Sequence, residues 1–409
     1  MNYDLIIRQV RITDDFHLVD IGIIDGYITT IEACIEGVGN DEIAGLGRVL
    51  VSGFVESHLH LEKAYVMDRK ANASGTLQEA IAVTAALKPT FTSADITERA
   101  TKALRALVRN GTTHVRAHAE FDPTQGFTGL DAVLALREKY KDIITIQVVA
   151  FPQEGIIKAE GTKEMMYEAM MRGADVVGGI PYNDSSAKEH IDFVFELAKE
   201  FDKDIDLHQD FSDNADSLSI EYVANKTIEQ GWQGRVSVGH LTALDAVNAE
   251  ERTRLISLIK AAEISVMCLP ATDMHLGARG DEYSVRRMIA PVRALRDGGV
   301  NVCLATNNIQ NAFTPFSTGN LLHISMLAIP ACHLGGADDQ KTILPMLTYN
   351  PAKALGLKDY GVGVGKRADL VLLDCEKVSN VVIDIPNCAY VLKGGSVVSK
   401  NDISSAVSF

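Results

Sequence analysis

Apolar runs alternate with longer amphipathic segments through the middle of the chain, from residue 51 to residue 355. Short runs rich in β-branched residues are typical of buried parallel strands, and segments with a 3.6-residue period are typical of helices. The predicted strands are the stretch that starts at Gly53 and residues 113–119, 144–152, 175–181, 204–210, 235–241, 264–270 and 301–307. Eight such β-then-α units predict an α/β fold, a parallel (β/α)8 TIM-like barrel.

Helical patterns lie between these strands. They cover residues 95–110, 129–141, 162–172, 187–201 and 285–297. Asp95 and Glu98 have the spacing of a capping box, and Asn110-Gly111 is a stop signal for the first helix. The rival architecture is a doubly wound open sheet, which favours a Gly-x-Gly-x-x-Gly motif at its first turn. The sequence has no such motif there, so the barrel is preferred.

Both ends of the chain have a different pattern, made of short β-rich runs. Asp25-Gly26 separates two β-branched runs and predicts a hairpin. Runs at residues 368–373 and 390–398 predict further strands near the other end, the second of them turning on two glycines. Each end is too small to be stable alone. We therefore expect residues 1–50 and 356–409 to form one composite β-sandwich beside a barrel of residues 51–355.

The composition says little about the fold, but it restricts the kinds of partner that the protein can bind. A formal net charge of −15 disfavours binding to nucleic acid or to acidic membranes, because a phosphate partner needs a basic face. No apolar run approaches the ~20 residues of a membrane span, and the start of the chain lacks the basic and apolar regions of a signal peptide. Six scattered cysteines without CxxC spacing predict reduced core residues. The expected location is the cytoplasm.

Several histidines fall at the ends of predicted strands. His58 and His60 end the first strand with i, i+2 spacing, so both side chains point to the same face. His208 ends the fifth strand, His240 ends the sixth, and His118 ends the second. The carboxyl ends of barrel strands meet at one rim, where imidazole nitrogens can hold a divalent metal. The alternative for the first pair is two surface histidines in a loop.

The chain resembles the amidohydrolase superfamily, in particular its cytosine deaminase-like branch, over essentially its whole length. The matching pieces are Gly-Phe-Val-Glu-Ser-His58-Leu-His60, Val115-Arg116-Ala117-His118, Gln147 to Ile156, Asp206-Leu-His208-Gln-Asp210, Gly239-His240-Leu-Thr242-Ala243-Leu244 and Gly365-Lys-Arg-Ala-Asp369. The run from Gln147 to Ile156 is the most branch-specific of these pieces. His60-Leu-Glu62-Lys63 resembles instead the related enzymes that remove isopropylamine from N-isopropylammelide.

The resemblance implies a metal centre and a reaction. His58, His60 and His208 would bind one catalytic divalent metal, Zn²⁺ or Fe²⁺. His240 would hydrogen-bond the attacking water or the attacked oxygen and stabilise the developing charge. A metal of this kind lowers the pKa of its bound water, so that hydroxide is available near neutrality to attack a carbon that bears an amine.

The resemblance also implies a small heterocyclic substrate and a homo-oligomer. Gln147 would contact the amide edge of the heterocycle. The other candidates for substrate binding are Phe151, Asn308, Phe211 and His118.

The chain departs from the family at two proton-transfer positions. Asn307 stands where the family has an aspartate at the end of strand 8, and Phe211 stands where cytosine deaminases have a glutamate shuttle. An amide does not accept a proton at ordinary pH, and general acid–base help contributes about 10²–10⁴-fold in rate. Asp210 is the preferred replacement, because it lies two residues beyond His208 and so shares its face of the strand. Lys63 is the second candidate.

Two weaker candidates and the origin of the amide stay open. Glu62 and Asp213 are replacement acids or ordinary solvated loop charges. Asn307 is a deliberate Asp→Asn change, a natural divergence with a relocated base, or a sign that hydrolysis has been lost. Gln310 and Asn311 also replace residues that are charged in the family, which favours natural divergence.

Three functions follow from these residues. The preferred one is a metal-dependent hydrolase that cleaves a C–N bond of a small nitrogen heterocycle, such as an aminopyrimidine or an aminotriazine. The alternative is a catalytically diverged barrel that binds a heterocycle or serves as an assembly subunit. A third is an isomerase or lyase that uses Lys63 and Asp210.

Overall fold

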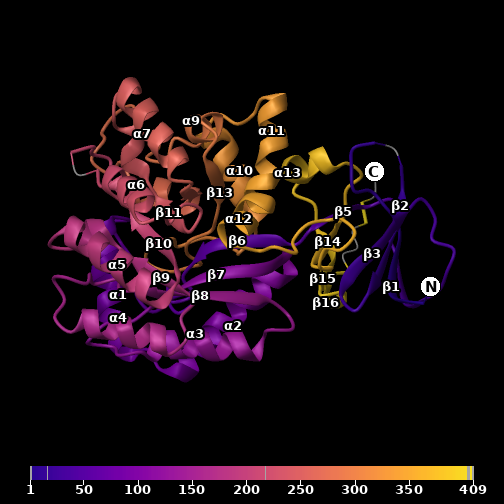
Figure 1. The fold of residues 1–409 in the computed structure, drawn as a ribbon, viewed down its shortest axis with the longest axis horizontal. Coiled ribbons are helices and arrows are strands. Elements are labelled where there is room, and N and C mark those ends of the chain that lie inside the picture. The colour runs from indigo at the N-terminus through magenta and orange to yellow at the C-terminus, as the bar shows by residue number, and fades with distance from the viewer. Residues whose placement is uncertain (1, 16, 217, 403–405, 408–409) are drawn as a thin grey trace.

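Parallel strands form the centre of the computed structural model, which describes residues 2–15, 17–216, 218–402 and 406–407 (Figure 1). They pair in sequence order as one eight-stranded sheet. The strands are β6 (Phe54–Leu59), β7 (Thr112–Glu120), β8 (Thr145–Phe151), β9 (Val176–Gly179), β10 (Asp204–Gln209), β11 (Val236–His240), β12 (Ser265–Cys268) and β13 (Asn301–Leu304). The predicted TIM-like barrel is confirmed.

The first and last strands of this sheet meet through a single backbone bridge. Leu59 and Asn307 form an isolated parallel bridge between the end of β6 and the segment after β13. The amide of His60 donates to the carbonyl of Asn307 at 2.9 Å, and the amide of Asn307 donates to the carbonyl of His58 at 2.9 Å. The nearly closed barrel is thus completed by residues that the sequence marks as site residues.

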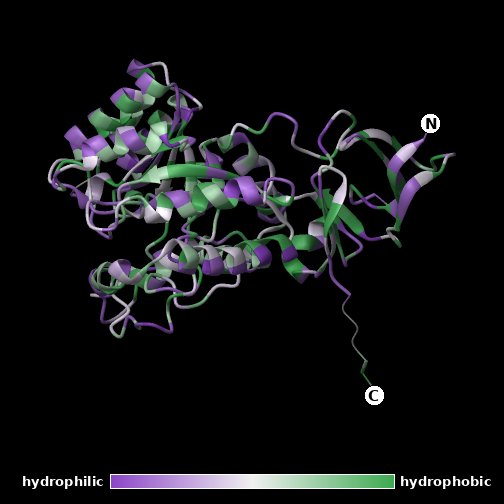
Figure 2. Cartoon of the chain, turned by 90° about the horizontal axis from the view of Figure 1, so that it is seen from below, coloured by the Kyte–Doolittle hydropathy of each residue, from purple (hydrophilic) through white to green (hydrophobic). Residues whose placement is uncertain are grey.

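Helices lie between the strands and around the barrel. They are α1 (Leu77–Leu87), α2 (Ser93–Arg109), α3 (Thr128–Lys139), α4 (Thr162–Met171), α5 (Ala187–Phe201), α6 (Ile220–Glu229), α7 (Ala249–Ala261), α8 (Pro270–Leu276), α9 (Val292–Asp297), α10 (Leu321–Ala331), α11 (Ala337–Ile343), α12 (Tyr349–Ala354) and α13 (Val381–Asp384). Hydrophilic and hydrophobic bands alternate along them (Figure 2). In α2, for example, Ile96, Ala100, Ala103 and Leu107 are fully buried at the 3-to-4-residue spacing of one helix face.

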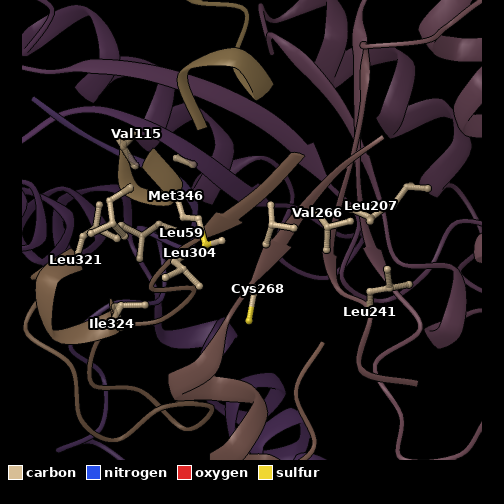
Figure 3. Packing of buried hydrophobic residues seen from close by; sticks show 14 of the residues in the cluster. Leu59, Val115, Leu207, Leu241, Val266, Cys268, Leu304, Leu321, Ile324 and Met346 are labelled. Atoms are coloured by element: carbon tan, nitrogen blue, oxygen red, sulfur yellow. The ribbon is translucent and has the colours of Figure 1, made fainter. Parts of the chain in front are cut away.

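Side chains from the strands and from the inner helix faces share one apolar core. Figure 3 shows Leu207, Val266 and Leu304 from three strands in this cluster, with Leu321 and Ile324 from α10. Packing of this kind fixes the height of each strand in the barrel, and therefore the height of the polar residue at each strand end.

Two details of the predicted helices are wrong. The first helix starts earlier than expected, because the Thr92 hydroxyl, and not Asp95, caps α2 by accepting a hydrogen bond from the Asp95 amide. The segment expected to be helical from residue 285 becomes helical only at Val292, directly after Pro291. Pro291 is the N-cap residue of α9, and a helix that began at residue 285 would have this proline in its interior, where the missing N–H and the ring break it.

Both chain ends contribute to a pair of small sheets at one end of the molecule (Figure 1). One sheet has the order β3-β2-β1-β4, and the other has the order β16-β15-β14-β5. Their strands are β1 (Tyr3–Val10), β2 (Val19–Ile24), β3 (Tyr27–Glu32), β4 (Gly39–Ala44), β5 (Val49–Ser52), β14 (Leu370–Leu373), β15 (Cys388–Lys393) and β16 (Ser396–Lys400). The predicted hairpin turn has positive φ at both Asp25 (52°) and Gly26 (79°), as a type I′ turn requires.

The two small sheets share an apolar interior. Leu5, Ile7 and Ile21 from the first sheet cluster with Leu50 and Leu370 from the second. Strand β5 pairs with β14, so an N-terminal segment completes a sheet that is otherwise C-terminal. The exact domain boundaries stay a prediction, and the proposed boundary after residue 50 falls inside β5.

Two further observations bear on the composition. All six cysteines lie in the described part of the chain and all are free thiols. In the same part of the chain, no helix has the length and the apolar character that crossing a membrane requires.

Candidate active site

Three imidazoles meet at the carboxyl ends of the barrel strands. His58 lies in β6, His60 follows β6 directly, and His208 lies in β10. The Nε2 atom of His208 is 3.2 Å from that of His58 and 3.0 Å from that of His60. All three side chains are buried. The structure therefore gathers residues that are 150 positions apart in the sequence around one point.

The donor set of these three side chains suits a divalent metal. The histidines whose nitrogens all lie within 4.8 Å of one another are His58, His208 and His240. Burial lowers the pKa of each imidazole well below its ordinary value, so that the neutral form with a free lone pair is favoured. Two nitrogen ligands about 2.0–2.1 Å from one tetrahedral Zn²⁺ lie roughly 3.3 Å apart, close to the separation of His208 Nε2 from each of the other two Nε2 atoms. The metal-ligand assignment itself stays a prediction.

His240 stands beside this cluster with its own acidic partner. Its ring centroid is 5.3 Å from that of His208, and its Nδ1 is 2.6 Å from Oδ1 of Asp273. Asp273 lies in the first turn of α8, is fully buried, and has a second oxygen, Oδ2, without a partner. Burial raises the pKa of Asp273, and the contact with His240 acts in the opposite direction.

Sequence reasoning missed Asp273. The available signal was its place in Leu269-Pro270-Ala-Thr-Asp273, directly after strand β12, where the barrel rim predicts functional residues.

Asn307 is at the rim, as predicted. It lines the pocket, is buried, and has a φ of 63°. Its side-chain oxygen Oδ1 has no hydrogen-bond partner. A buried amide oxygen without a partner is rare in native structures and marks a place where a ligand atom or water is expected.

The pocket next to these residues has an empty volume of about 420 Å³. Its apolar wall comes from Leu77, Ile81, Ile180, Phe211, Leu276 and Phe313. Its polar lining comes from His60, Lys63, Gln153, Asn183, His208, His240, Thr272, Asn307 and Asn308. Tyr182, which is both aromatic and polar, also lines the pocket. Phe211 and Asn308, two of the candidates for substrate binding, are among the lining residues. The lining, all of it within the described residues, includes no carboxylate.

Lys63 brings a positive charge to this pocket. Its buried Nζ donates to Oε2 of Glu120 and to Oε1 of Gln153, both at 3.1 Å. On its other side Glu120 contacts Lys88, whose Nζ also contacts Asp122 at 3.0 Å. Burial tends to raise the pKa of Glu120, but the attraction of the two lysines is stronger and lowers this pKa below its ordinary value. Glu120 therefore holds Lys63 as a fixed donor without facing the pocket itself.

Gln147 is not brought to the pocket. Its side-chain oxygen accepts a hydrogen bond from Nε of Arg116 at 2.7 Å, and it lies near the start of β8, at the opposite rim of the barrel. Gln153, two residues beyond the end of β8, stands in the pocket instead. Both glutamines belong to the same matching motif. They differ in their position along β8, and only the one beyond the end of the strand reaches the pocket.

Asp210 is not a pocket residue either. Its φ of 45° takes the chain out of the extended conformation directly after β10, so the alternation of side chains stops there. Its carboxylate accepts hydrogen bonds from the amides of Ser219 and Ile220 at 3.1 and 2.9 Å and from the Ser219 hydroxyl at 2.9 Å. Asp210 thus caps the N-terminus of α6.

Phe151 and His118 support the cluster from behind. The Phe151 ring stacks on His208 with centroids 4.2 Å apart and an interplanar angle of 27°. The His118 ring lies 3.9 Å from that of His58, and its Nε2 is 3.1 Å from Asp206. Neither residue lines the pocket, so the prediction that they contact substrate is not supported.

The two remaining acids differ. Glu62 is buried, and burial raises its pKa to about 7, so its interpretation as a solvated loop charge is wrong. Asp213 lies at the surface and pairs with Arg286 at 3.4 Å. Arg99 fixes the loop that carries Glu62 by donating to the carbonyls of Glu62 and Ala64 at 2.9 and 2.7 Å.

Comparison with known proteins places this barrel among hydrolases. The chain is 30% identical to the N-isopropylammelide isopropyl amidohydrolase of Pseudomonas sp. (strain ADP) over 98% of both chains. It is 27% identical to the pterin deaminase of Rhizobium rhizogenes (strain K84), over 85% of this chain and 80% of the relative.

A solved structure agrees closely with the fold. The crystal structure of 5-methylcytosine deaminase from Klebsiella pneumoniae, liganded with phosphonocytosine, superposes with a TM-score of 0.94 at 31% identity and covers 98% of this chain and 100% of that chain. The model that describes the amidohydrolase family matches residues 42–399. The chain belongs to the amidohydrolase family.

Proposed function

We propose that this protein is a metal-dependent hydrolase that removes an amine or ammonia from a small planar nitrogen heterocycle by cleaving an exocyclic C–N bond. The approach of the Nε2 atoms of His58 and His60 to that of His208, at the wall of the pocket, carries the proposal. The similar proteins named above, an isopropyl amidohydrolase and two deaminases, support the substrate class.

The three histidines would hold one divalent ion, Zn²⁺ or Fe²⁺. When bound, such an ion lowers the pKa of a coordinated water and polarises the carbon centre under attack. The histidines are preorganised for this task, since the stacked Phe151 ring and the neighbouring His118 ring restrict their orientation.

The rest of the pocket would bind and orient the heterocycle. The Lys63 ammonium and the Gln153 amide present donors side by side and suit the carbonyl oxygen and ring nitrogen of an amide-like edge. Phe211, Leu276 and Phe313 provide apolar surface against which a flat ring packs. A pocket with a lysine and no lining carboxylate favours neutral or anionic rings over cationic ones.

The direct test is a panel assay with metal analysis. The protein purified with Zn²⁺ or Fe²⁺ is expected to bind about one ion per chain and to release ammonia or an alkylamine from at least one aminotriazine, aminopyrimidine or aminopteridine. Hydrolysis in H₂¹⁸O must place ¹⁸O in the product ring. The variant His208→Ala is expected to lose both metal and turnover, whereas His323→Asn, at an exposed position of α10, keeps both.

One observation favours a second candidate, a barrel that binds heterocycles without turnover. Asn307 and Phe211 place an amide and a phenyl ring where an acid would serve proton transfer. Tight binding of a panel compound without product, by a fully metal-loaded protein, would select this candidate over the hydrolase.

A further inference from the structure

The pocket needs a proton acceptor, and its own lining offers few. Asn307 is an amide and Phe211 is a hydrocarbon, so neither takes a proton from water. Among the described residues, no carboxylate lines the pocket. Lys63 already donates to Glu120 and Gln153, and Asp210 is engaged in capping α6.

We propose that Asp273 makes His240 the proton acceptor and donor of this site, in place of a carboxylate at position 307. This inference rests on the proposed hydrolytic function and names the group that moves the proton. In this arrangement His240 is a catalytic residue, and Asp273 is a positioning residue that acts through it.

The geometry of the pair determines which nitrogen of His240 accepts the proton. Nδ1 of His240 and Oδ1 of Asp273 are 2.6 Å apart, a separation typical of a short charge-assisted hydrogen bond. This contact holds the proton of neutral His240 on Nδ1 and leaves the lone pair on Nε2. Because His240 lines the pocket and its Nδ1 is occupied, Nε2 is the atom available to a water or substrate there.

The imidazole of the pair is held in place by the backbone turn and by Phe211. His240 and the following residue, Leu241, have φ values of 70° and 54°, which turn the chain sharply at the end of β11. The Leu241 amide donates to the carbonyl of Gln209 at 2.9 Å, which keeps this turn in place. The Phe211 ring packs against the imidazole with centroids 4.6 Å apart. The phenyl ring that replaces the family's acid therefore buttresses the replacement base.

The carboxylate of Asp273 has few hydrogen-bond partners besides His240. Asp273 is fully buried, and its Oδ2 has no hydrogen-bond partner. A buried carboxylate with an unpartnered oxygen is costly unless a positive charge is present or forms nearby. An imidazolium formed at His240 during the reaction would supply that charge, in the way a buried aspartate stabilises the histidine of a catalytic triad.

The proton balance closes without another reactant. The attacking water gives one proton to Nε2 of His240 while its oxygen bonds to the ring carbon. The imidazolium then passes this proton to the departing nitrogen as the C–N bond breaks. The ring keeps the oxygen, the amine leaves with the extra proton, and His240 returns to its neutral form.

The kinetic test uses Asp273→Asn in the metal-loaded protein, with an active heterocycle from the panel. We expect kcat to fall about 10²–10⁴-fold while KM stays within threefold. Asp273→Glu, which keeps a carboxylate, should retain more kcat than the amide variant. Asp369→Asn is the matched control, because Asp369 is another buried aspartate beside a histidine, 3.4 Å from His114, and its kcat should stay within threefold of the wild type.

Restoring the family's acid sharpens the test. Asn307→Asp should raise kcat in the Asp273→Asn background at least tenfold more than it does in the wild type, since each carboxylate then serves the same proton. A kcat within threefold of the wild type for Asp273→Asn, or an equal effect of Asn307→Asp in both backgrounds, would overturn the proposal.

A spectroscopic readout separates this inference from the proposed function. In ¹⁵N-histidine-labelled protein, assigned with His240→Gln, we expect a downfield Nδ1 proton and an unprotonated Nε2, and we expect both signals to be lost in Asp273→Asn. If the wild type hydrolyses nothing in the panel, the proposed function fails, and this spectrum alone decides whether Asp273 sets the state of His240. An Nε2-protonated ring in the wild type would overturn the inference.

Discussion

Two layers of polar side chains lie inside the barrel, and they differ in how completely their hydrogen bonds are made. In the lower layer, the fully buried Arg116 donates to Gln147, Asp206 and the carbonyl of Ala354 at 2.7, 2.7 and 3.0 Å. In the upper layer, the buried atoms without a partner include Oδ1 of Asn307 and Oδ2 of Asp273.

This difference separates stability from function. A satisfied buried network fixes one arrangement of the strands and needs nothing from solution. Unsatisfied buried atoms are costly to the folded chain, so an unpartnered oxygen of a pocket residue, Oδ1 of Asn307, indicates that a ligand atom or water completes it. The lower layer therefore supports the fold, and the upper layer is prepared for chemistry.

The largest expected effect comes from breaking the lower layer. Arg116→Met leaves Asp206 as a buried carboxylate that has lost its strongest partner, at 2.7 Å. We expect the free energy of unfolding, measured by urea denaturation, to fall by about 3–5 kcal/mol. The double variant Arg116→Met with Asp206→Leu should recover part of this loss. A loss below about 1 kcal/mol in the single variant would refute the assigned role.

The matching change in the upper layer should have the opposite profile. His208→Ala is expected to weaken Zn²⁺ binding more than about 100-fold, since even the loss of a supporting residue costs 10–100-fold. In the metal-free state, its free energy of unfolding should fall by less than that of the Arg116 variant, because removing a neutral ring leaves no buried charge without its partner. Competition with a chelating dye measures the affinity.

A pair of glutamine variants compares the layers directly. Gln153→Leu removes a pocket group and should raise KM for the heterocycle about tenfold, the cost of roughly one hydrogen bond to a charged or polar partner. Gln147→Leu should leave KM within twofold and instead lower the unfolding free energy, because Arg116 loses its acceptor at 2.7 Å. The reverse assignment of effects would restore Gln147 as the substrate-binding residue.

The smallest expected effect concerns the ion pairs that support the rim from outside. Burial tends to raise the pKa of Asp95, but hydrogen bonds from Arg69 and Arg99 outweigh this effect and lower the pKa to about 2. A pKa lowered by folding contributes stability that is present above the unfolded pKa of about 3.9 and is lost as the pH falls towards 2. Asp95→Asn should therefore cost about 1 kcal/mol at pH 7, after allowance for solvent screening, and almost nothing near pH 2. Urea titrations at both pH values provide the measurement.

Much of this architecture was accessible from the sequence because it depends on periodicity. Buried parallel strands at regular spacing predicted the barrel, and the strand-end positions of His58, His60 and His208 predicted their convergence. The rule that carboxyl ends share one rim needs no knowledge of side-chain contacts.

The errors have a common physical cause, since each concerns the point where regular backbone stops. Asp210 was placed inward by alternation, but its positive φ turns it towards α6. Gln147 was placed in the pocket, but it lies too low on β8. Asp273 escaped notice because α8, a helix of seven residues, is too short for a periodic pattern, so that only its place directly after β12 marks it.

The seam that joins the first and last strands has a consequence for biosynthesis. The carboxylate of Glu56 accepts hydrogen bonds from the amide of Thr306, 250 residues later, and Asn307 is paired with the backbone on either side of Leu59. A chain still emerging from the ribosome can carry every imidazole of the cluster and yet lack the wall that encloses them. Contacts between such distant residues form late and slowly, so the centre matures only when translation has passed the eighth strand.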